Sequence, residues 1–171
     1  MRKVLLFIFL LLSSVGMMAQ GRVKVSMGVY TCDRKDSTVN VRRAPNGDVV
    51  ARLNNLSQVR IDMIQGKWCR MSNDYVDDAG EYRKVSKTGG RFWVHISCLA
   101  CDFIGDGGVE INLYEEASRK SKRTVITTDE ENRPQEILDM KGEWIRLKLV
   151  NGVVAWVPEE YICGNPLTVC N

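Results

Sequence analysis

Two pairs of tryptophans, set in matching local sequences, constrain the fold of this chain more than any other feature. The four tryptophans of the chain are Trp68, Trp93, Trp144 and Trp156. The first of each pair stands two residues after a glycine, and the second stands directly before a valine. Ordered repetition of such features predicts two copies of one small structural unit.

Apolar and polar residues alternate along most of the chain beyond the N-terminal segment. The run from Val59 to Met63 alternates with period two, which is typical of a half-buried strand. Asn151-Gly152, between two alternating apolar runs, is a strong hairpin signal. No later segment has sustained helical periodicity. The sequence therefore predicts an all-β fold.

The same alternation orients the first tryptophan of each pair. Ile145 and Leu147 share one face of their strand, and Trp144 lies on the other. In the first copy the pattern places Cys69 inward and Trp68 outward. An outward tryptophan serves either as a platform for a ligand or as a plug between two units.

The first 19 residues have the layout of a secretory signal peptide. Two basic residues precede an apolar run from Val4 to Leu12, and the stretch from Ser13 to Ala19 leads to a cut before Gln20. The apolar run is too short to span a bilayer, which takes about 20 residues. We expect an exported protein, periplasmic or secreted, without a transmembrane segment after cleavage.

The charges of the chain exclude one class of partner. It has 24 basic and 21 acidic residues, and two of the basic ones lie in the signal peptide. A nearly neutral mature chain offers no broad surface for phosphate backbones. We therefore expect no nucleic-acid partner.

An even number of cysteines in an exported chain predicts disulfides. The six cysteines are Cys32, Cys69, Cys98, Cys101, Cys163 and Cys170. The last two bracket a short, turn-rich loop and are expected to pair with each other. The other four are expected as disulfide partners in one of three pairings, which the sequence leaves open. The alternative is that some of them are reduced, buried residues.

Breaker clusters and the repeat divide the chain into segments, with Gly-Asp-Gly-Gly at residues 105–108 marking the boundary between the copies. The expected segments are a signal peptide (1–19), a lead-in (20–37), a first unit (38–104), a second unit (109–163) and a disulfide-closed tail (164–171). The first unit has about a dozen more residues between its tryptophans than the second. We place this extension in a loop or enlarged hairpin over residues 73–90.

Three stretches of the first copy have the order and spacing of a known module. They are Asn-Val-Arg-Arg-Ala-Pro at 40–45, Gly-Lys-Trp at 66–68 and Trp-Val-His-Ile-Ser-Cys-Leu at 93–99. With them the first copy resembles the bacterial SH3-like (SH3b) family. The second copy keeps Gly-Glu-Trp at 142–144, Trp-Val at 156–157 and Tyr-Ile at 161–162, but residues 112–117 lack the arginine and proline of the opening motif.

The resemblance implies two small SH3-like β-barrels in tandem, with five to seven short strands each. It also implies a protein of the cell envelope that binds cell-wall peptide or an envelope protein. No hydrolase domain accompanies the two units, so we expect a non-catalytic binding or scaffolding module without a cofactor. The alternative is a structural or inhibitory partner protein whose tryptophans are buried between the units.

The first copy has the better candidate for a ligand groove. The expected groove residues are Trp68, Arg70, Trp93 and His95, overhung by Tyr75 and Tyr82 from the extension. The aromatic rings would stack against a short extended peptide, and the polar groups would fix its register. The second pair of tryptophans is expected to support the packing of the units.

Catalysis and metal binding are weaker alternatives. His95, the only histidine, lies on the same strand face as Trp93, so an envelope enzyme using His95 or a cysteine ranks third. The Cys98-Leu99-Ala100-Cys101 spacing matches redox motifs, but no helix is predicted to activate a thiolate. The acidic extension does not have the spacing of a calcium loop, and no metal site is expected.

Overall fold

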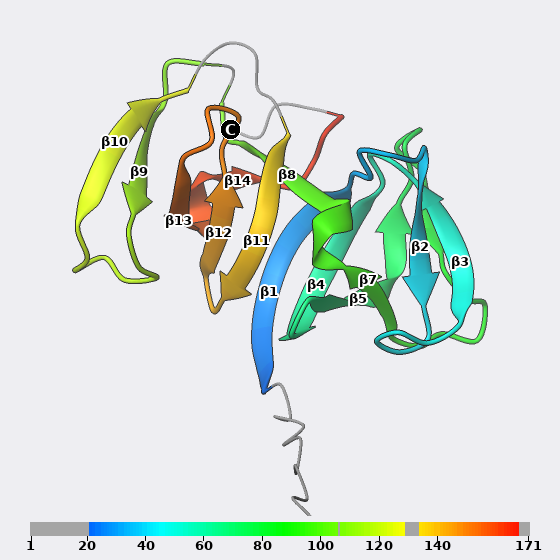
Figure 1. Cartoon of the computed structure of the whole chain (residues 1–171). Coiled ribbons are helices and arrows are strands. Elements are labelled where there is room, and N and C mark those ends of the chain that lie inside the picture. Colours follow the sequence, from blue (N-terminus) through cyan, green and yellow to red (C-terminus); the bar gives the residue numbers. More distant parts are fainter. Residues whose placement is uncertain (1–20, 106, 129–133, 168–171) are drawn as a thin grey trace, which may run out of the picture.

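Strands account for nearly all of the regular structure in the computed structural model, which describes residues 21–105, 107–128 and 134–167 (Figure 1). The elements are β1 (Arg22–Thr31), β2 (Thr38–Arg42), β3 (Val49–Asn54), β4 (Gln58–Gln65), β5 (Trp68–Val76), β6 (Tyr82–Lys84), β7 (Phe92–His95), the 3-10 turn η1 (Ile96–Cys98), β8 (Leu99–Phe103), β9 (Glu110–Tyr114), β10 (Arg123–Thr127), β11 (Gln135–Lys141), β12 (Trp144–Lys148), β13 (Val154–Pro158), the 3-10 turn η2 (Glu159–Tyr161) and β14 (Ile162–Cys163). The all-β prediction is confirmed. The expected signal peptide and Cys170 lie outside the described residues.

Within the described ranges, no helix has the length and apolar character needed to cross a bilayer.

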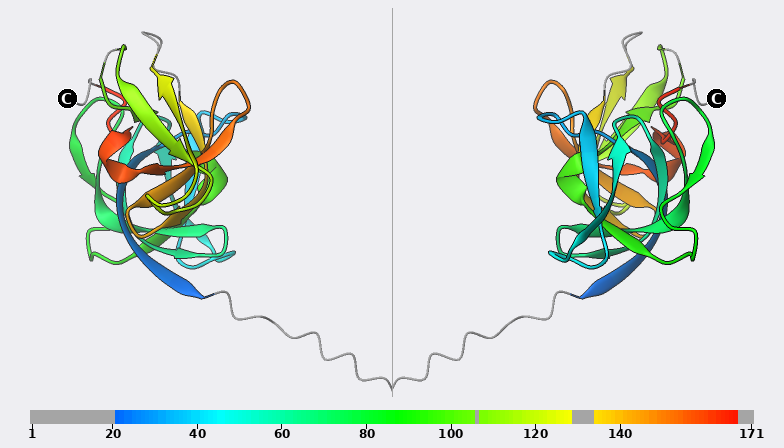
Figure 2. Two further views of the ribbon diagram at one scale, coloured as in Figure 1. Left: turned by 90° about the vertical axis from the view of Figure 1, so that its left-hand side faces the viewer. Right: turned by 90° about the vertical axis from the view of Figure 1, so that its right-hand side faces the viewer.

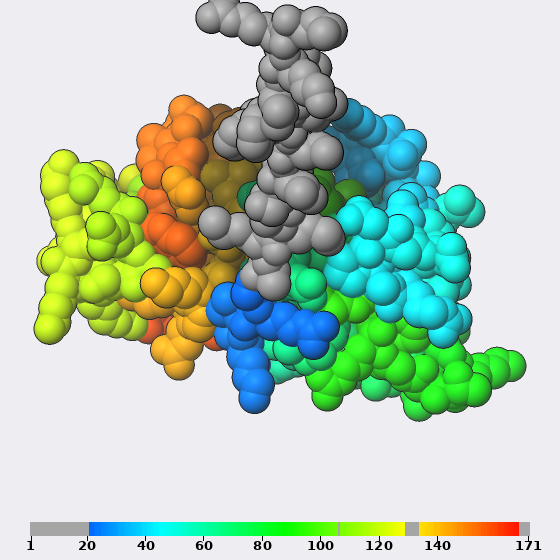
Figure 3. All heavy atoms as spheres, turned by 60° about the horizontal axis from the view of Figure 1, so that its bottom comes forward, coloured from blue at the N-terminus to red at the C-terminus, as the bar shows by residue number. Residues whose placement is uncertain are grey.

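The strands form one 14-stranded sheet in which the named strands pair antiparallel. Its order is β10-β9-β13-β12-β11-β8-β1-β4-β5-β7-β2-β3, with β14 beside β8 and β6 beside β5. The side views show that the sheet is strongly coiled (Figure 2). In the space-filling view, the start of β1 lies between the second repeat, in yellow and orange, and the first repeat, in cyan and green (Figure 3).

The sequence repeat is also a repeat of β register. We call residues 38–104 the first repeat and residues 109–163 the second repeat. In the first repeat Trp68 is paired with His95, and in the second Trp144 is paired with Pro158 at the matching position. Two residues before these tryptophans, Gly66 and Gly142 have φ angles of 60° and 61°. Glycine adopts this left-handed conformation without steric cost. The Gly-x-Trp motif is therefore the turn between two long strands.

The ends of the two repeats match as well. In each, a strand with the second tryptophan leads through one 3-10 turn into a closing strand: β7-η1-β8 and β13-η2-β14. The Ile96 N–H donates to the Lys67 carbonyl at 2.9 Å, and the Glu159 N–H donates to the Glu143 carbonyl at 2.8 Å. These two bonds occupy equivalent positions, so the closing segment packs against the Gly-x-Trp turn in the same way in both repeats.

The predicted inward and outward faces are confirmed. Side chains on the inward face are fully or almost fully buried: Cys69, Met71, Val94, Ile145, Leu147, Leu149 and Val157. Trp68 and Trp144 are half-exposed, as expected for the opposite face. Burial of the aliphatic row stabilises each hairpin by about 25 cal/mol for each Å² of apolar surface removed from water.

The lead-in of residues 20–37 differs most from the expectation. It contributes β1, a ten-residue strand between β4 and β8. Met27, Val29 and Tyr30 of this strand are fully buried. The alternation of its valines is the local signal for a strand, but both of its partners are distant in sequence, so its central position depends on long-range pairing.

β8 belongs to both repeats. It pairs with β1 at the end of the first repeat, and it pairs with β11 and β14 within the second. In each repeat the closing strand pairs with the strand that precedes the repeat in the chain. β8 pairs with β1 in this way, and β14 pairs with β8. The two repeats are therefore joined by a shared strand.

A partly buried hydrogen bond ties β1 to β8. The Tyr30 hydroxyl donates to Asp102 Oδ1 at 2.6 Å. Burial raises the pKa of Asp102 above its ordinary value, and the bond from Tyr30 partly offsets this by favouring the ionised form. The Tyr30 hydroxyl thus stabilises the ionised form of Asp102 against the cost of its burial.

We expect Tyr30→Phe to lower the free energy of unfolding by about 1–3 kcal/mol at pH 7, because it leaves a half-buried carboxylate without this donor. Ionisation of a carboxyl with a raised folded pKa opposes folding, and the penalty disappears as pH falls below its unfolded pKa of about 3.9. The cost of Tyr30→Phe should therefore shrink on acidification. Urea unfolding of both proteins at pH 7 and at about pH 3.5, below the unfolded pKa, measures it, and an equal cost at both pH values would contradict the assignment.

Candidate functional site

Four of the predicted groove residues lie together on the outward face of β5 and β7. Trp68 is paired with His95 across the two strands, and Arg70 is paired with Trp93. The Trp68 and His95 rings meet edge to face, with centroids 5.2 Å apart. Arg42 of β2 places its guanidinium carbon 5.8 Å from the centroid of the Trp68 ring. Sequence reasoning thus predicted this cluster but missed Arg42, whose alignment with Trp93 needs the β2–β7 pairing.

The arginine of the cluster already has a partner among neighbouring side chains, and one of its tryptophans is buried. Arg70 donates to both carboxylate oxygens of Asp62, at 2.7 and 3.1 Å, and Arg91 donates to the same carboxylate at 3.0 Å. Trp93 is only 8% exposed. Its ring therefore offers little surface to a ligand, and only Trp68 and His95 remain half-open.

His95 has a local structural role. Its Nδ1 accepts from the Ser97 N–H at 3.4 Å and lies 2.7 Å from Ser97 Oγ, so it caps η1. Because Nδ1 accepts the backbone proton, the neutral ring carries its hydrogen on Nε2. Burial, with a smaller contribution from the nearby Lys67 ammonium, lowers the pKa of His95.

Tyr75 and Tyr82 lie elsewhere, which corrects the expected position of these two rings over the tryptophans. Both line a separate hollow of about 350 Å³, and none of the four residues of the tryptophan cluster is part of its lining. Tyr75 also packs against the core, whereas Tyr82 is 88% exposed. The six predicted residues therefore form two sites.

The tyrosine hollow, as we name the space lined by Tyr75 and Tyr82, lies where the C-terminal segment meets the first repeat. Its walls come from β1, β4, β5, β6 and the segment after β14. The other lining residues are Gly28, Gln58, Val59, Arg60, Asp74, Val76, Gly164 and Asn165. The Gln58 amide donates to Asn165 Oδ1 at 2.9 Å, which joins the two sides of the hollow.

Two glycines shape this hollow. A Cβ on Gly164 would collide with the backbone of Gly28, so the C-terminal segment can approach β1 only with glycine at position 164. A Cβ on Gly28 would meet no atom within 4 Å and would project into open space. A glycine inside an alternating strand is a sequence signal for close backbone approach, and it is the only local hint of this site.

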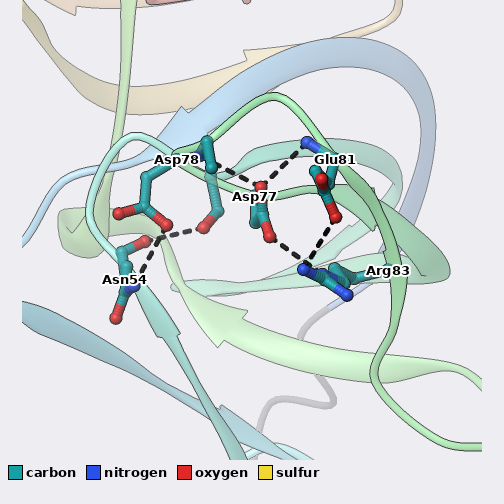
Figure 4. Close-up of polar contacts among 7 residues, drawn as sticks. Asn54, Asp77, Asp78, Glu81 and Arg83 are labelled. Carbon is teal, nitrogen blue, oxygen red and sulfur yellow. Dashed lines mark hydrogen bonds and ion pairs between the residues drawn. The ribbon is translucent and has the colours of Figure 1, made fainter.

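The predicted extension forms a hairpin next to the hollow. β6 pairs with β5, placing Tyr75 opposite Arg83 and Val76 opposite Tyr82. At its tip, Asp77 accepts from the Ala79 and Glu81 N–H groups and from Arg83 Nε, the last at 2.9 Å (Figure 4). The acidic side chains thus organise the turn that presents Tyr82.

A second tip contact holds the hairpin to β3. The Asn54 amide donates to Asp78 Oδ1 at 3.0 Å (Figure 4). Across the described ranges, His, Cys, Asp and Glu side chains form no group of three or more that is suited to a metal ion.

The second repeat has an aromatic pair where the first has its tryptophan cluster. Trp144 and Tyr114 meet edge to face with centroids 5.1 Å apart. Beside them, Arg119 of the basic loop forms a two-pronged ion pair with Glu160, at 3.2 and 2.7 Å. The rings of Trp68 and Trp144 thus contact aromatic rings of their own repeats. These contacts do not favour the alternative in which the tryptophans are buried between the two units.

The structure corrects the expected disulfides at two of the cysteines, Cys69 and Cys101. Cys32, Cys69, Cys98 and Cys101, expected as disulfide partners, are free thiols. Cys69 and Cys101 are fully buried, and across the sheet they face Val94 and Gln135, so neither has a cysteine opposite it. The expected bond between Cys163 and Cys170 stays a prediction, because Cys170 lies outside the described residues.

Comparisons with known proteins do not assign the chain to a family. No family model matches the chain, and no curated protein matches it. Among solved structures, the structure of NlpC2 from Trichomonas vaginalis aligns with 81% of this chain and 48% of that chain, at 14% identity and a TM-score of 0.32. The chain thus spans about half the length of that protein, and a similarity at this level carries no argument about function.

We expect the single histidine to titrate below its ordinary pKa of about 6.5. Because the folded pKa is lowered, protonation opposes folding, and stability should fall as pH drops through 6.5 toward the folded value. Replacing Lys67 with methionine should raise the pKa only in part, since burial is the larger cause. NMR titration of the ring protons measures both values, and a wild-type pKa at or above 6.5 would refute the burial argument.

Proposed function

We propose that the protein is an exported, non-catalytic binding module that holds a short extended cell-wall peptide in the tyrosine hollow. The observation that carries this proposal is the exposed Tyr82 ring at the rim of an apolar hollow of about 350 Å³. That volume falls within the range of small-ligand sites, about 300–1,000 Å³. An exposed ring on an ordered hairpin is a stacking surface with few rotatable bonds to immobilise.

Charges at the rim suit a peptide that carries both an amine and a carboxylate. Arg60 is exposed and donates to Ser26 Oγ at 2.6 Å, so its guanidinium is held beside the hollow. Asp74 on the other strand is also exposed and is only loosely paired with Lys84, at 3.9 Å. A cationic and an anionic side chain on the same rim would fix the direction of a short peptide.

The proposal includes an architecture of two tandem SH3-like barrels that share β8. Its support is the common topology of the repeats, in which β2-β3-β4-β5-β7-η1-β8 corresponds to β9-β10-β11-β12-β13-η2-β14. The matching registers around Trp68 and Trp144 add to it. Export is supported by the signal-peptide layout of residues 1–19.

The absence of an enzymatic role is part of the same proposal. His95 caps η1 through Ser97, and Cys69 and Cys101 are fully buried core residues. Burial raises the pKa of both thiols, which disfavours a nucleophilic thiolate. The functional surface is therefore one of recognition.

Two substitutions test the hollow without disturbing the core. Tyr82→Ala removes an exposed ring and should weaken binding about tenfold or more, as for an aromatic anchor. Gly28→Leu should fill the hollow, because its new side chain points into open space, and it should also abolish binding. Calorimetric titration with soluble peptide fragments released from purified cell wall measures both effects.

Gly21→Leu is the matched control, since a Cβ at Gly21 also meets no atom within 4 Å and Gly21 lies outside the hollow. It should bind like the wild type, and all three variants should keep the wild-type melting temperature within a few degrees. Failure of the wild-type chain to bind wall peptides, or unchanged affinity in both hollow variants, would overturn the proposal.

A further inference from the structure

Two of the free cysteines stand opposite each other where β1 meets β8. The antiparallel register pairs Tyr30 with Ala100 and Thr31 with Leu99. The next pair in the same register is Cys32 with Cys98, and the Cys32 N–H donates to the Cys98 carbonyl at 2.9 Å. This hydrogen bond holds the two backbones together just beyond the last paired residues of the ladder, where Cys98 is the final residue of η1.

Residues directly opposite in an antiparallel ladder have Cα atoms about 4.5–5.5 Å apart and side chains on the same face. A disulfide needs a Cα separation of about 4.4–6.8 Å. Cys32 and Cys98 lie one residue beyond the paired residues of this ladder and share a backbone hydrogen bond, so this spacing brings a cross-strand bridge within reach. The electrostatic influence of Cys32 on the titration of Cys98 is consistent with neighbouring sulfur atoms.

The second repeat uses the equivalent position for a different pair. There the Ile104 N–H donates to the Tyr161 carbonyl at 3.1 Å, as Cys32 does to Cys98. Both Ile104 and Tyr161 are half-buried. The two junctions therefore share a backbone contact, but only the first carries two thiols.

The two thiols are within reach of a reagent. Both cysteines are half-buried, in contrast to Cys69 and Cys101. Cys32 lines a hollow of about 500 Å³ together with residues of β11, β12 and the hairpin that follows β12. The Cys98 thiol donates to Asp33 Oδ2 at 3.6 Å.

We propose that Cys32 and Cys98 are a redox modification site, in which thiol–disulfide exchange with a small disulfide or a disulfide-bearing oxidoreductase joins them. In the first step one thiolate attacks the incoming disulfide, forming a mixed disulfide and releasing one thiol. In the second step the other cysteine displaces the remaining thiol, so two protein thiols become one bridge and the oxidant becomes two thiols. This selects one of the three pairings that the sequence left open, leaving Cys69 and Cys101 reduced.

The bridge would fasten the point where the repeats join. It would connect the end of β1 to the start of β8, and β8 is the strand that the second repeat shares. Burial raises the pKa of both thiols, and the Asp33 carboxylate adds to this at Cys98. Uncatalysed exchange at neutral pH should therefore be slow, and it should speed up as pH rises.

The test uses the purified chain, reduced and then incubated with an excess of glutathione disulfide at pH 8. Remaining thiols are alkylated under denaturing conditions, and peptides are mapped by mass spectrometry without reduction. We expect a peptide that links Cys32 to Cys98 and alkylation of Cys69 and Cys101. The bridge closes a long loop, so oxidation should raise the melting temperature by about 5–15 °C.

Cys32→Ala/Cys98→Ala is the matched variant, and its melting temperature should not change with glutathione disulfide. A different linkage, or alkylated Cys32 and Cys98 after prolonged incubation, would overturn the assignment. The peptide map of the wild-type chain decides this even if the variant folds poorly. Its outcome is separate from peptide binding, which depends on Tyr82 and Gly28.

Discussion

The short β1–β8 ladder is the contact on which the rest of the structure depends. β8 pairs with β1, β11 and β14, so it carries the β-ladder from one repeat to the other, and a single parallel bridge between Val25 of β1 and Gly142 adds a second backbone contact. The ladder is short, and Tyr30 reinforces it by donating to Asp102 on the neighbouring strand. Lys67 adds a further tie by donating to the Leu138 carbonyl of β11 at 3.1 Å. The repeats thus form one continuous sheet. They are joined by a short ladder and by side-chain hydrogen bonds of Tyr30 and Lys67.

Local patterns predicted the strands well because alternation is a local property. Ile145 and Leu147 face the core, and Trp144 faces outward, as period two requires. The Gly-x-Trp repeat also predicted two equivalent hairpins. The position of β1 was not predictable in this way, because its partners β4 and β8 are separated from it by long stretches of chain.

The candidate site was predicted only in part, and the register explains why. Trp68 and Arg70 share a face with His95 and Trp93 because β5 and β7 pair regularly. The pairing of β4 with β5 shifts twice, between Val59 and Ile61 and again between Ile61 and Met63. Such irregularities are not visible in the sequence, and beyond them β5 continues toward β6 and the tyrosine hollow. Aromatic residues that are neighbours in sequence therefore belong to two surfaces.

In the proposed binding mode, recognition at the tyrosine hollow depends on the whole chain. One wall consists of strands of the first repeat and the other of Gly164 and Asn165, which follow the last strand of the second repeat. The C-terminal segment can reach β1 only because Gly164 has no side chain to collide with Gly28. The proposed peptide would contact both walls, so its binding would also stabilise the docking of the C-terminal segment on β1, by RT ln(1 + [L]/Kd). In this proposal the second repeat contributes to binding through the segment that it positions, without a ligand site of its own.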